Sequence, residues 1–227
     1  MEPFEYQPSL ESLIDSFPEP EVLLKAAKNG GEPARVALVQ LWLSEGIPHA
    51  FHECPAIYES VRTWLSSQID VHSKEISLVG SARLGKSYVP SQLGKPFDSE
   101  SDLDLFVVSS SLFAKLRDEF HLWSLHYKNG QIEANSRKEE TYYWPNNCRE
   151  VPKNIKRGFI DTIKIPNRSL YPTAQNVNNT MWKLVKKLEI TPNAPSPKNA
   201  SIRCFSSWHS FVQQNSLNLE LACEKGR

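Results

Sequence analysis

The chain has 227 residues, of which 40% are hydrophobic and 23% are charged, and its formal net charge is zero. This composition is typical of a globular protein that can bury a full core, and it argues against a disordered or collagen-like chain. No run of about 18 apolar residues is present and the acidic start MEPFE does not resemble a signal peptide, so we expect a cytoplasmic protein without a membrane span.

The charges are unevenly distributed along the chain. Residues 1–110 contain 8 Lys and Arg against 16 Asp and Glu, whereas residues 111–227 contain 18 against 10. Two explanations fit this asymmetry: a polyanionic partner binds the C-terminal half, or the two halves dock on one another.

Residues 1–73 are predicted to form a helical N-terminal segment that packs on the core. Apolar residues recur at helical spacing in residues 10–17, and a short helix is expected over residues 21–28. Pro33 and Pro55 should each open a further helix, because proline suits the first helical turn.

The core, residues 74–170, begins with two predicted strands. Residues 75–79 (EISLV) form the first, which ends in the turn Gly80-Ser81. Residues 101–108 (SDLDLFVV) form the second, and its apolar run is preceded by two carboxylates.

These carboxylates are the most informative feature of the sequence. Because side chains alternate along a strand, Asp102 and Asp104 share one face about 6.5–7 Å apart, while Leu103 points into the core. Two carboxylates held so close repel each other unless a cation lies between them, and Mg²⁺ binds carboxylate oxygens together with substrate phosphates. A neighbouring Gly-Ser turn offers N–H groups and a hydroxyl to a phosphate, which indicates nucleotidyl transfer.

The same region contains a competing motif. Residues 80–87, GSARLGKS, satisfy the P-loop pattern G-x-x-x-x-G-K-[ST]. A P-loop needs a helix that starts at Lys86-Ser87, yet residues 88–96 contain two prolines and a glycine, which oppose a helix. A Walker B aspartate would also follow its apolar run, whereas these carboxylates precede theirs. We therefore favour the carboxylate interpretation.

The rest of the core is predicted from local patterns. A helix is expected over residues 109–127, followed by a polar, irregular segment over residues 128–157. Residues 158–165 alternate and predict a strand with Asp161 near its middle.

Residues 171–227 are predicted to be C-terminal helices that complete the same domain. One helix should cover residues 175–188, and a loop rich in Pro, Asn and Ser follows over residues 191–200. The last helix should carry an apolar row formed by Ile202, Phe205, Trp208 and Phe211.

The GS sequence at residues 80–81 and the DLD sequence at residues 102–104 resemble the nucleotidyltransferase superfamily of DNA polymerase β. This superfamily includes CCA-adding enzymes, poly(A) polymerases, cGAS-like cyclases and bacterial minimal nucleotidyltransferase toxins. Its pattern is an apolar strand, G-[GS], then [DE]-h-[DE]-h and a third carboxylate on a later strand. The resemblance covers roughly residues 74–166 and implies an α/β fold with a small, mixed, twisted sheet and flanking helices.

The chain departs from this pattern in one respect. The separation between Ser81 and Asp102 is longer than is usual in the superfamily. The excess, residues 88–100, would be an inserted loop at the mouth of the site, where its polar and cationic residues could meet the acceptor or the base.

The resemblance implies that Asp102, Asp104 and Asp161 are catalytic residues and bind two Mg²⁺ ions, which Mn²⁺ could replace. Asp161 lies in an apolar strand, where an unpaired charge is unfavourable, and this favours a ligand role. The alternative for Asp102 and Asp104 is a solvated strand entry. The alternatives for Asp161 are an ion pair with Arg157 or Lys164, and Glu133 in its place as third ligand.

The resemblance also implies nucleotide-binding residues. Gly80 and Ser81 would hold the β- or γ-phosphate, with added charge from Arg83 and Lys86. Arg83 could instead pair with Glu100. On the later helix, cations of related folds hold the triphosphate, and the matching residues are Lys183, Lys186 and Lys187; a solvated basic face is the alternative.

The function expected from this resemblance is Mg²⁺-dependent transfer of a nucleoside monophosphate from an NTP, such as ATP, with release of pyrophosphate. The acceptor could be a protein, an RNA 3′ end or a nucleotide, in a toxin–antitoxin or antiviral defence context. The alternative is a non-catalytic nucleotide- or RNA-binding partner subunit, or an antitoxin, with the same fold. The sequence leaves the preferred NTP and the oligomeric state open.

Overall fold

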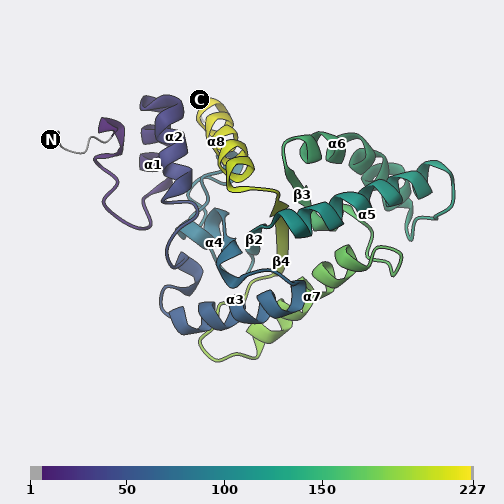
Figure 1. Ribbon diagram of the computed structural model, residues 1–227. Coiled ribbons are helices and arrows are strands. Elements are labelled where there is room, and N and C mark those ends of the chain that lie inside the picture. Colours follow the sequence, from purple (N-terminus) through teal and green to yellow (C-terminus); the bar gives the residue numbers. More distant parts are fainter. Residues whose placement is uncertain (1–6, 226–227) are drawn as a thin grey trace.

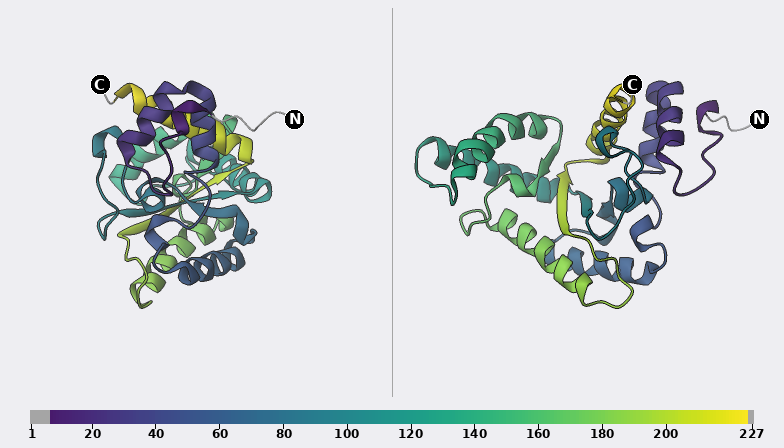
Figure 2. Two further views of the ribbon diagram at one scale, coloured as in Figure 1. Left: turned by 90° about the vertical axis from the view of Figure 1, so that its left-hand side faces the viewer. Right: turned by 180° about the vertical axis from the view of Figure 1, so that it is seen from behind.

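A four-stranded mixed sheet lies at the centre of the molecule, with helices on both of its faces (Figures 1 and 2). The computed structural model describes residues 7–225, so the acidic start at residues 1–5 lies outside the described part. The strands, in the sheet order β1-β2-β4-β3, are β1 Ile76–Leu78, β2 Asp102–Val108, β4 Asn199–Phe205 and β3 Phe159–Asp161. The predicted α/β architecture with a mixed sheet is confirmed.

Strand β4 joins the two halves of the sheet. It runs parallel to β2 over seven residue pairs, from Asp102 opposite Asn199 to Val108 opposite Phe205. On its other side it pairs antiparallel with β3, and β1 pairs antiparallel with the outer edge of β2. The two outer strands, β1 and β3, are therefore joined to one another only through the β2–β4 ladder.

The helices form two layers around the sheet. Within residues 7–225 they are α1 Pro20–Asn29, α2 Gly31–Gln40, α3 Pro55–Ile69, α4 Gly80–Leu84, α5 Ser110–Lys128, α6 Trp144–Lys156, α7 Pro172–Glu189 and α8 Trp208–Lys225. Helices α1, α2 and α8 lie together on one side and α3 and α7 on the other, while α5 and α6 extend beyond one end of the sheet (Figures 1 and 2). No helix of the described residues is both long and apolar enough to cross a membrane.

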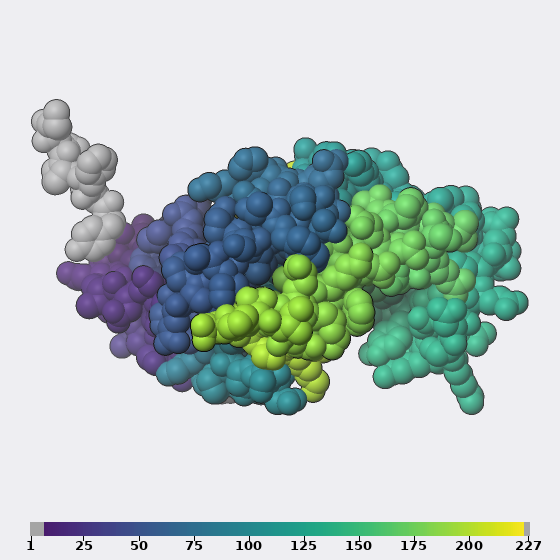
Figure 3. Space-filling model, turned by 90° about the horizontal axis from the view of Figure 1, so that it is seen from below, coloured from purple at the N-terminus to yellow at the C-terminus, as the bar shows by residue number. Residues whose placement is uncertain are grey.

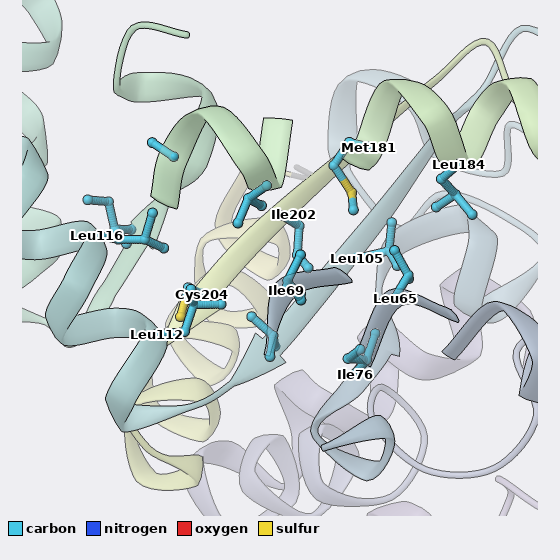
Figure 4. Packing of buried hydrophobic residues seen from close by; sticks show 14 of the residues in the cluster. Leu65, Ile69, Ile76, Leu105, Leu112, Leu116, Met181, Leu184, Ile202 and Cys204 are labelled. Carbon is cyan, nitrogen blue, oxygen red and sulfur yellow. The ribbon is translucent and has the colours of Figure 1, made fainter. Parts of the chain in front are cut away.

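Alternate side chains of β2 enter two separate apolar clusters. Leu103, Leu105 and Val107 belong to the cluster that contains α3, α5 and α7, and Figure 4 shows Leu105 among residues of α3 and α7. Phe106 and Val108 belong to the cluster that contains α1, α2 and α8. Since strand side chains alternate, both aspartates of β2 must share the face of Phe106.

Most helices with local signals begin and end close to the predicted residues. Helix α3 begins at Pro55 as predicted, and α1, α2, α5 and α7 match the remaining helical predictions within a few residues. Residues 10–17 were the exception, because only a 3₁₀ turn at Pro8–Leu10 forms there. Leu13 is buried but its neighbour Ile14 is 88% exposed, so the apolar residues of this segment do not form the single buried face of an amphipathic helix.

The prediction of an irregular segment at residues 128–157 was wrong in its second half. A π-helical turn, Glu139–Tyr143, leads directly into α6. The missed signal was the helical spacing of the buried residues Trp144, Asn147 and Val151, which was obscured by Pro152 inside the helix.

Two further predictions near the C-terminus and around Asp161 were wrong. Residues 199–205 form strand β4 and not part of a loop and helix, so residues 171–227 contribute a central strand as well as helices. Strand β3 ends at Asp161, after which Thr162–Lys164 form a 3₁₀ turn. Asp161 therefore lies at the end of a strand and not near its middle.

Ion pairs do little to explain the charge asymmetry. Among the described residues, acidic side chains of the first half pair with basic ones of the second at Asp70–Lys115 and Glu100–Lys198, at 3.5 and 3.1 Å. All four side chains are more than half exposed, and such pairs typically contribute less than about 1 kcal/mol. The two halves are joined mainly by the apolar clusters.

Gly85, which ends α4, offers a test of this part of the fold. Its φ is +86°, and a Cβ there would lie 2.6 Å from the ring of His49, which packs against Phe17 and His52. Gly130 has a φ of +65° but open space around it. Gly130→Ala should lower the free energy of unfolding by about 1–2 kcal/mol, the cost of left-handed backbone. Gly85→Ala should add about 1–3 kcal/mol for overpacking. Urea unfolding of both variants measures the difference, and equal losses would contradict the close approach to His49.

Candidate functional site

The two aspartates of β2 lie at the start of the strand with their side chains on one face, as predicted. Both are exposed to solvent, and each is held by a polar side chain from the neighbouring strand. Asn199 Nδ2 donates to Asp102 Oδ1 at 3.1 Å, and Ser201 Oγ donates to Asp104 Oδ1 at 2.9 Å. Each carboxylate therefore has a fixed orientation and keeps a second oxygen that can accept further ligands.

The Gly-Ser pair lies directly beside this carboxylate face. A Cβ on Gly80 would stand 3.8 Å from Oδ2 of Asp104, and the Val79 N–H donates to the Asp104 carbonyl at 2.9 Å. The φ of Gly80 is +68°, a conformation that glycine adopts without strain. Gly80 and Ser81 begin the short helix α4, where the sequence predicted only a turn.

The structure excludes a P-loop in the chain that follows. Helix α4 ends before Gly85, and Lys86 pairs with Pro96 in an isolated antiparallel bridge. No helix begins at Lys86, so the phosphate-binding helix terminus of a P-loop is missing from these residues.

A small pocket joins the carboxylate face to the rest of the sheet. Its volume is about 170 Å³, and its walls come from β2, β3, β4 and helix α8. The polar residues that line it are Asp104, Asp161, Ser201, Arg203 and Asn215. Such a volume accommodates a phosphate group or a few water molecules but not a whole nucleotide.

Asp161 reaches this pocket from a strand that is not adjacent to β2. Strand β4 separates the two, so Asp161 shares the face of Asp104 without being its neighbour in the sheet. Its Oδ1 accepts a hydrogen bond from Nε of Arg203 at 2.6 Å. The ion pair that we considered for Asp161 thus exists, but its partner is Arg203 and not Arg157 or Lys164.

Burial is the main influence on the electrostatics of Asp104, and the neighbouring carboxylates add to it. The surrounding protein raises the pKa of Asp104 above its ordinary value even though the side chain is accessible to solvent. Asp102 and Asp161 raise it further, whereas the hydrogen bond from Ser201 and the charge of Arg203 act in the opposite direction. A cation bound at Asp104 would relieve this excess of negative charge.

Tyr88, in the segment that we expected to be an inserted loop, is buried near two residues of this pocket, Arg203 and Asp104. Burial raises the pKa of Tyr88 to about 12, and Arg203 and Asp104 are close enough to influence it. Residues 87–96 form a short turn that is closed by backbone hydrogen bonds. In one of them the Gly94 N–H donates to the Ser87 carbonyl oxygen at 2.9 Å. Tyr88 therefore brings this segment close to the carboxylate face.

Three of the predicted site residues lie elsewhere. Arg83 is buried, and its guanidinium donates to the carbonyls of Glu45 and Ile47, which leaves it neither at a phosphate nor paired with Glu100. Lys86 donates to the carboxylate of Glu19 at 2.6 Å. Glu133 is exposed in the loop after α5, and it does not line the pocket.

The lysines of α7 lie on the helix that covers the opposite face of the sheet. This helix packs against α3, as Figure 3 shows from below, and its apolar side belongs to the cluster of Leu105. Lys183 is exposed, and Lys187 Nζ stands 5.5 Å from the ring centre of Trp64. Lys186 pairs with Glu189. These positions fit the alternative of a solvated basic face and not a triphosphate contact.

The carboxylate face fits one Mg²⁺ ion. Among the described residues, no group of three or more His, Cys, Asp and Glu side chains is arranged to hold a metal. Mg²⁺, however, is commonly bound through one or two carboxylates, with water and substrate phosphates as the remaining ligands. Asp102 and Asp104 supply such a pair.

The site also contains residues that the sequence interpretation missed. Asn199, Ser201 and Arg203 all belong to β4, which was not predicted as a strand. The polar, apolar alternation of Ser201, Ile202, Arg203 and Cys204 was the available signal.

No family model matches the chain, and comparisons with curated proteins and with solved structures gave no match. The chemistry of this site must therefore be argued from its own residues.

The shifted pKa of Asp104 predicts how stability depends on pH. A carboxyl whose pKa is raised on folding lowers stability once the unfolded chain ionises, so Asp104→Asn should raise Tm at pH 7 in metal-free buffer. This gain should vanish as the pH falls below the ordinary value of 3.8. Thermal unfolding with EDTA measures it.

Asp98→Asn is the matched control, because hydrogen bonds from Ser101 and Glu100 lower the pKa of Asp98. That variant should lower Tm at pH 7, with a loss that shrinks toward acid pH. The same sign for both variants would contradict the assigned environment of Asp104.

Proposed function

We propose that this protein is a Mg²⁺-dependent nucleotidyltransferase that moves a nucleoside monophosphate from an NTP to an acceptor. The observation that supports this most directly is the close approach of Gly80 to the Asp104 carboxylate, where an added Cβ would stand 3.8 Å from Oδ2, with Asp102 on the same face. A phosphate-binding Gly-Ser pair and a metal-binding carboxylate pair are the two parts that such a reaction needs, and they come from separate segments of the chain.

The reaction would be a displacement at the α-phosphate. An acceptor hydroxyl oxygen forms a bond to the α-phosphorus, the bond from that phosphorus to the bridging oxygen breaks, and pyrophosphate leaves while the hydroxyl proton passes to solvent. A bound Mg²⁺ supplies charge stabilisation for the attacking and leaving oxygens. Asp102 and Asp104 would hold it, in orientations fixed by Asn199 and Ser201, and Ser81 would donate to the departing phosphates.

The surroundings of the pocket suggest how the nucleotide is placed. Since the pocket of about 170 Å³ admits little more than a phosphate, the sugar and base would lie on the open surface beside Asp102. Lys198, whose side chain is 57% exposed and which directly precedes Asn199, is a cation at this edge. A macromolecular or nucleotide acceptor could approach the same open surface.

One observation favours a non-catalytic binding protein as the second candidate. The carboxylate that the resemblance assigned as third metal ligand, Asp161, is paired with Arg203. A chain that only binds nucleotide or RNA would need no third ligand, and it could serve as a partner subunit or antitoxin.

Incubation with each of the four α-³²P-labelled NTPs, Mg²⁺ and cell extract tests the two candidates. Transfer of label to a macromolecule or a new nucleotide supports the enzyme. Asp102→Ala and Asp104→Ala should each lower the transfer rate at least tenfold, which corresponds to about 1.4 kcal/mol in the barrier. Asp118→Ala, on the exposed side of α5, should leave the rate unchanged. Retention of wild-type rates in both site variants would refute the assignment.

The phosphate contact can be tested separately by nucleotide binding. Ser81 follows Gly80, which lies beside the Asp104 carboxylate, whereas Lys86 is engaged with Glu19. Ser81→Ala should therefore weaken binding of a non-hydrolysable NTP more than Lys86→Ala does, by several-fold. Isothermal titration of both variants in the presence of Mg²⁺ decides this, and the reverse order would favour a phosphate role for Lys86.

A further inference from the structure

The geometry points to a site that takes a single divalent ion, in which the guanidinium of Arg203 supplies the second positive charge. This inference rests on the proposed function and concerns a residue that no motif indicated. Its basis is the position of Arg203 on the strand next to the aspartates, where it stands opposite both Phe106 and Asp161 in the sheet.

The guanidinium is fixed on two sides. Its Nε donates to Asp161 at 2.6 Å, and its Cζ lies 4.8 Å from the ring centre of Phe159. A charge-assisted hydrogen bond and a cation–π contact together hold the planar group in one orientation within the pocket that it shares with Asp104. Arg203 is therefore a built-in cation of the site and not a mobile surface residue.

The charges of the site favour one added ion over two. Among the protein's own groups, Asp102, Asp104 and Asp161 carry three negative charges and Arg203 one positive charge, so before nucleotide binds two negative charges are left for a single Mg²⁺ to neutralise. A second ion would need the carboxylate of Asp161 as ligand, but that side chain is only 19% exposed and already bound. Breaking a partly buried pair would leave an uncompensated charge, which is unfavourable.

The free side of Arg203 suits a phosphate. Among the described residues, only its Nε has a hydrogen-bond partner, and its side chain is 36% exposed. The nitrogens Nη1 and Nη2 thus remain to donate to phosphate oxygens, for which the planar fork of arginine is well shaped. Arg203 would then bind the polyphosphate of the NTP from within the pocket that it shares with Asp104.

Metal stoichiometry distinguishes this arrangement from a two-ion site. Mn²⁺ is titrated into the full chain with each α,β-methylene NTP in turn, and bound ions are counted by electron paramagnetic resonance. The wild type should bind one Mn²⁺ per chain. Arg203→Met should bind two, because Asp161 becomes free, and Arg203→Met combined with Asp161→Asn should return to one. Arg117→Met, which removes an exposed ion pair on α5, is the matched control and should bind one.

Two further variants keep the inference testable if Arg203→Met fails to fold. Asp161→Asn should still bind one Mn²⁺, whereas a ligand role for Asp161 would make it lose an ion. Arg203→Lys should also bind one, with nucleotide affinity reduced several-fold by loss of the fork. Two ions in the wild type would overturn the inference and leave the proposed function intact. No bound ion in the wild type with any of the four analogues would overturn both.

Discussion

The parallel ladder between β2 and β4 is the interaction on which the rest of this structure depends. It joins segments 97 residues apart in the chain and extends over all seven residues of both strands. Side chains reinforce it at its open end, where Asn199 and Ser201 donate to the aspartates of β2. Without β4 the β1–β2 pair would have an unpaired edge, and β3 would have no partner in the sheet.

The same ladder explains why a polar site can lie so close to two apolar cores. The first residues of β2 alternate between exposed aspartates and the buried leucines that pack on α3 and α7. Further along, both faces are buried, because Phe106 and Val108 enter the cluster with α8. The carboxylates therefore stand where the covering helices of their own face end. That position leaves them open to solvent yet surrounded by enough protein to raise the pKa of Asp104.

Elements that depend on residues close together in the chain could be predicted from the sequence, whereas those that depend on pairing between distant segments could not. Strands β1 and β2 and the helices α3, α5 and α7 are specified by local alternation or helical spacing, and these were predicted. Strand β4 was missed because Ile202, Phe205 and Trp208 recur every three residues, as in a helix, and only pairing with the distant β2 shows otherwise. The error carried over to the site, since the partner of Asp161 belongs to that strand. Glycine and aspartate motifs indicated a candidate site, but the charges around it depend on tertiary pairing.

The placement of positively charged residues around the site also depends on tertiary pairing. A basic helix at the position of α7 suggested a triphosphate contact, yet the register of β2 turns its aspartates away from that helix. Positive charge within the pocket of the carboxylate face comes instead from β4, through Arg203, while the nearby Lys198 is paired with Glu100. Since Arg203 is fixed by Asp161 and Phe159 before any substrate binds, it would require no reorganisation when phosphate arrives. If this guanidinium takes the place of a second ion, the site needs ligands for only one metal, which fits a face where two of the three acidic side chains remain open to an ion.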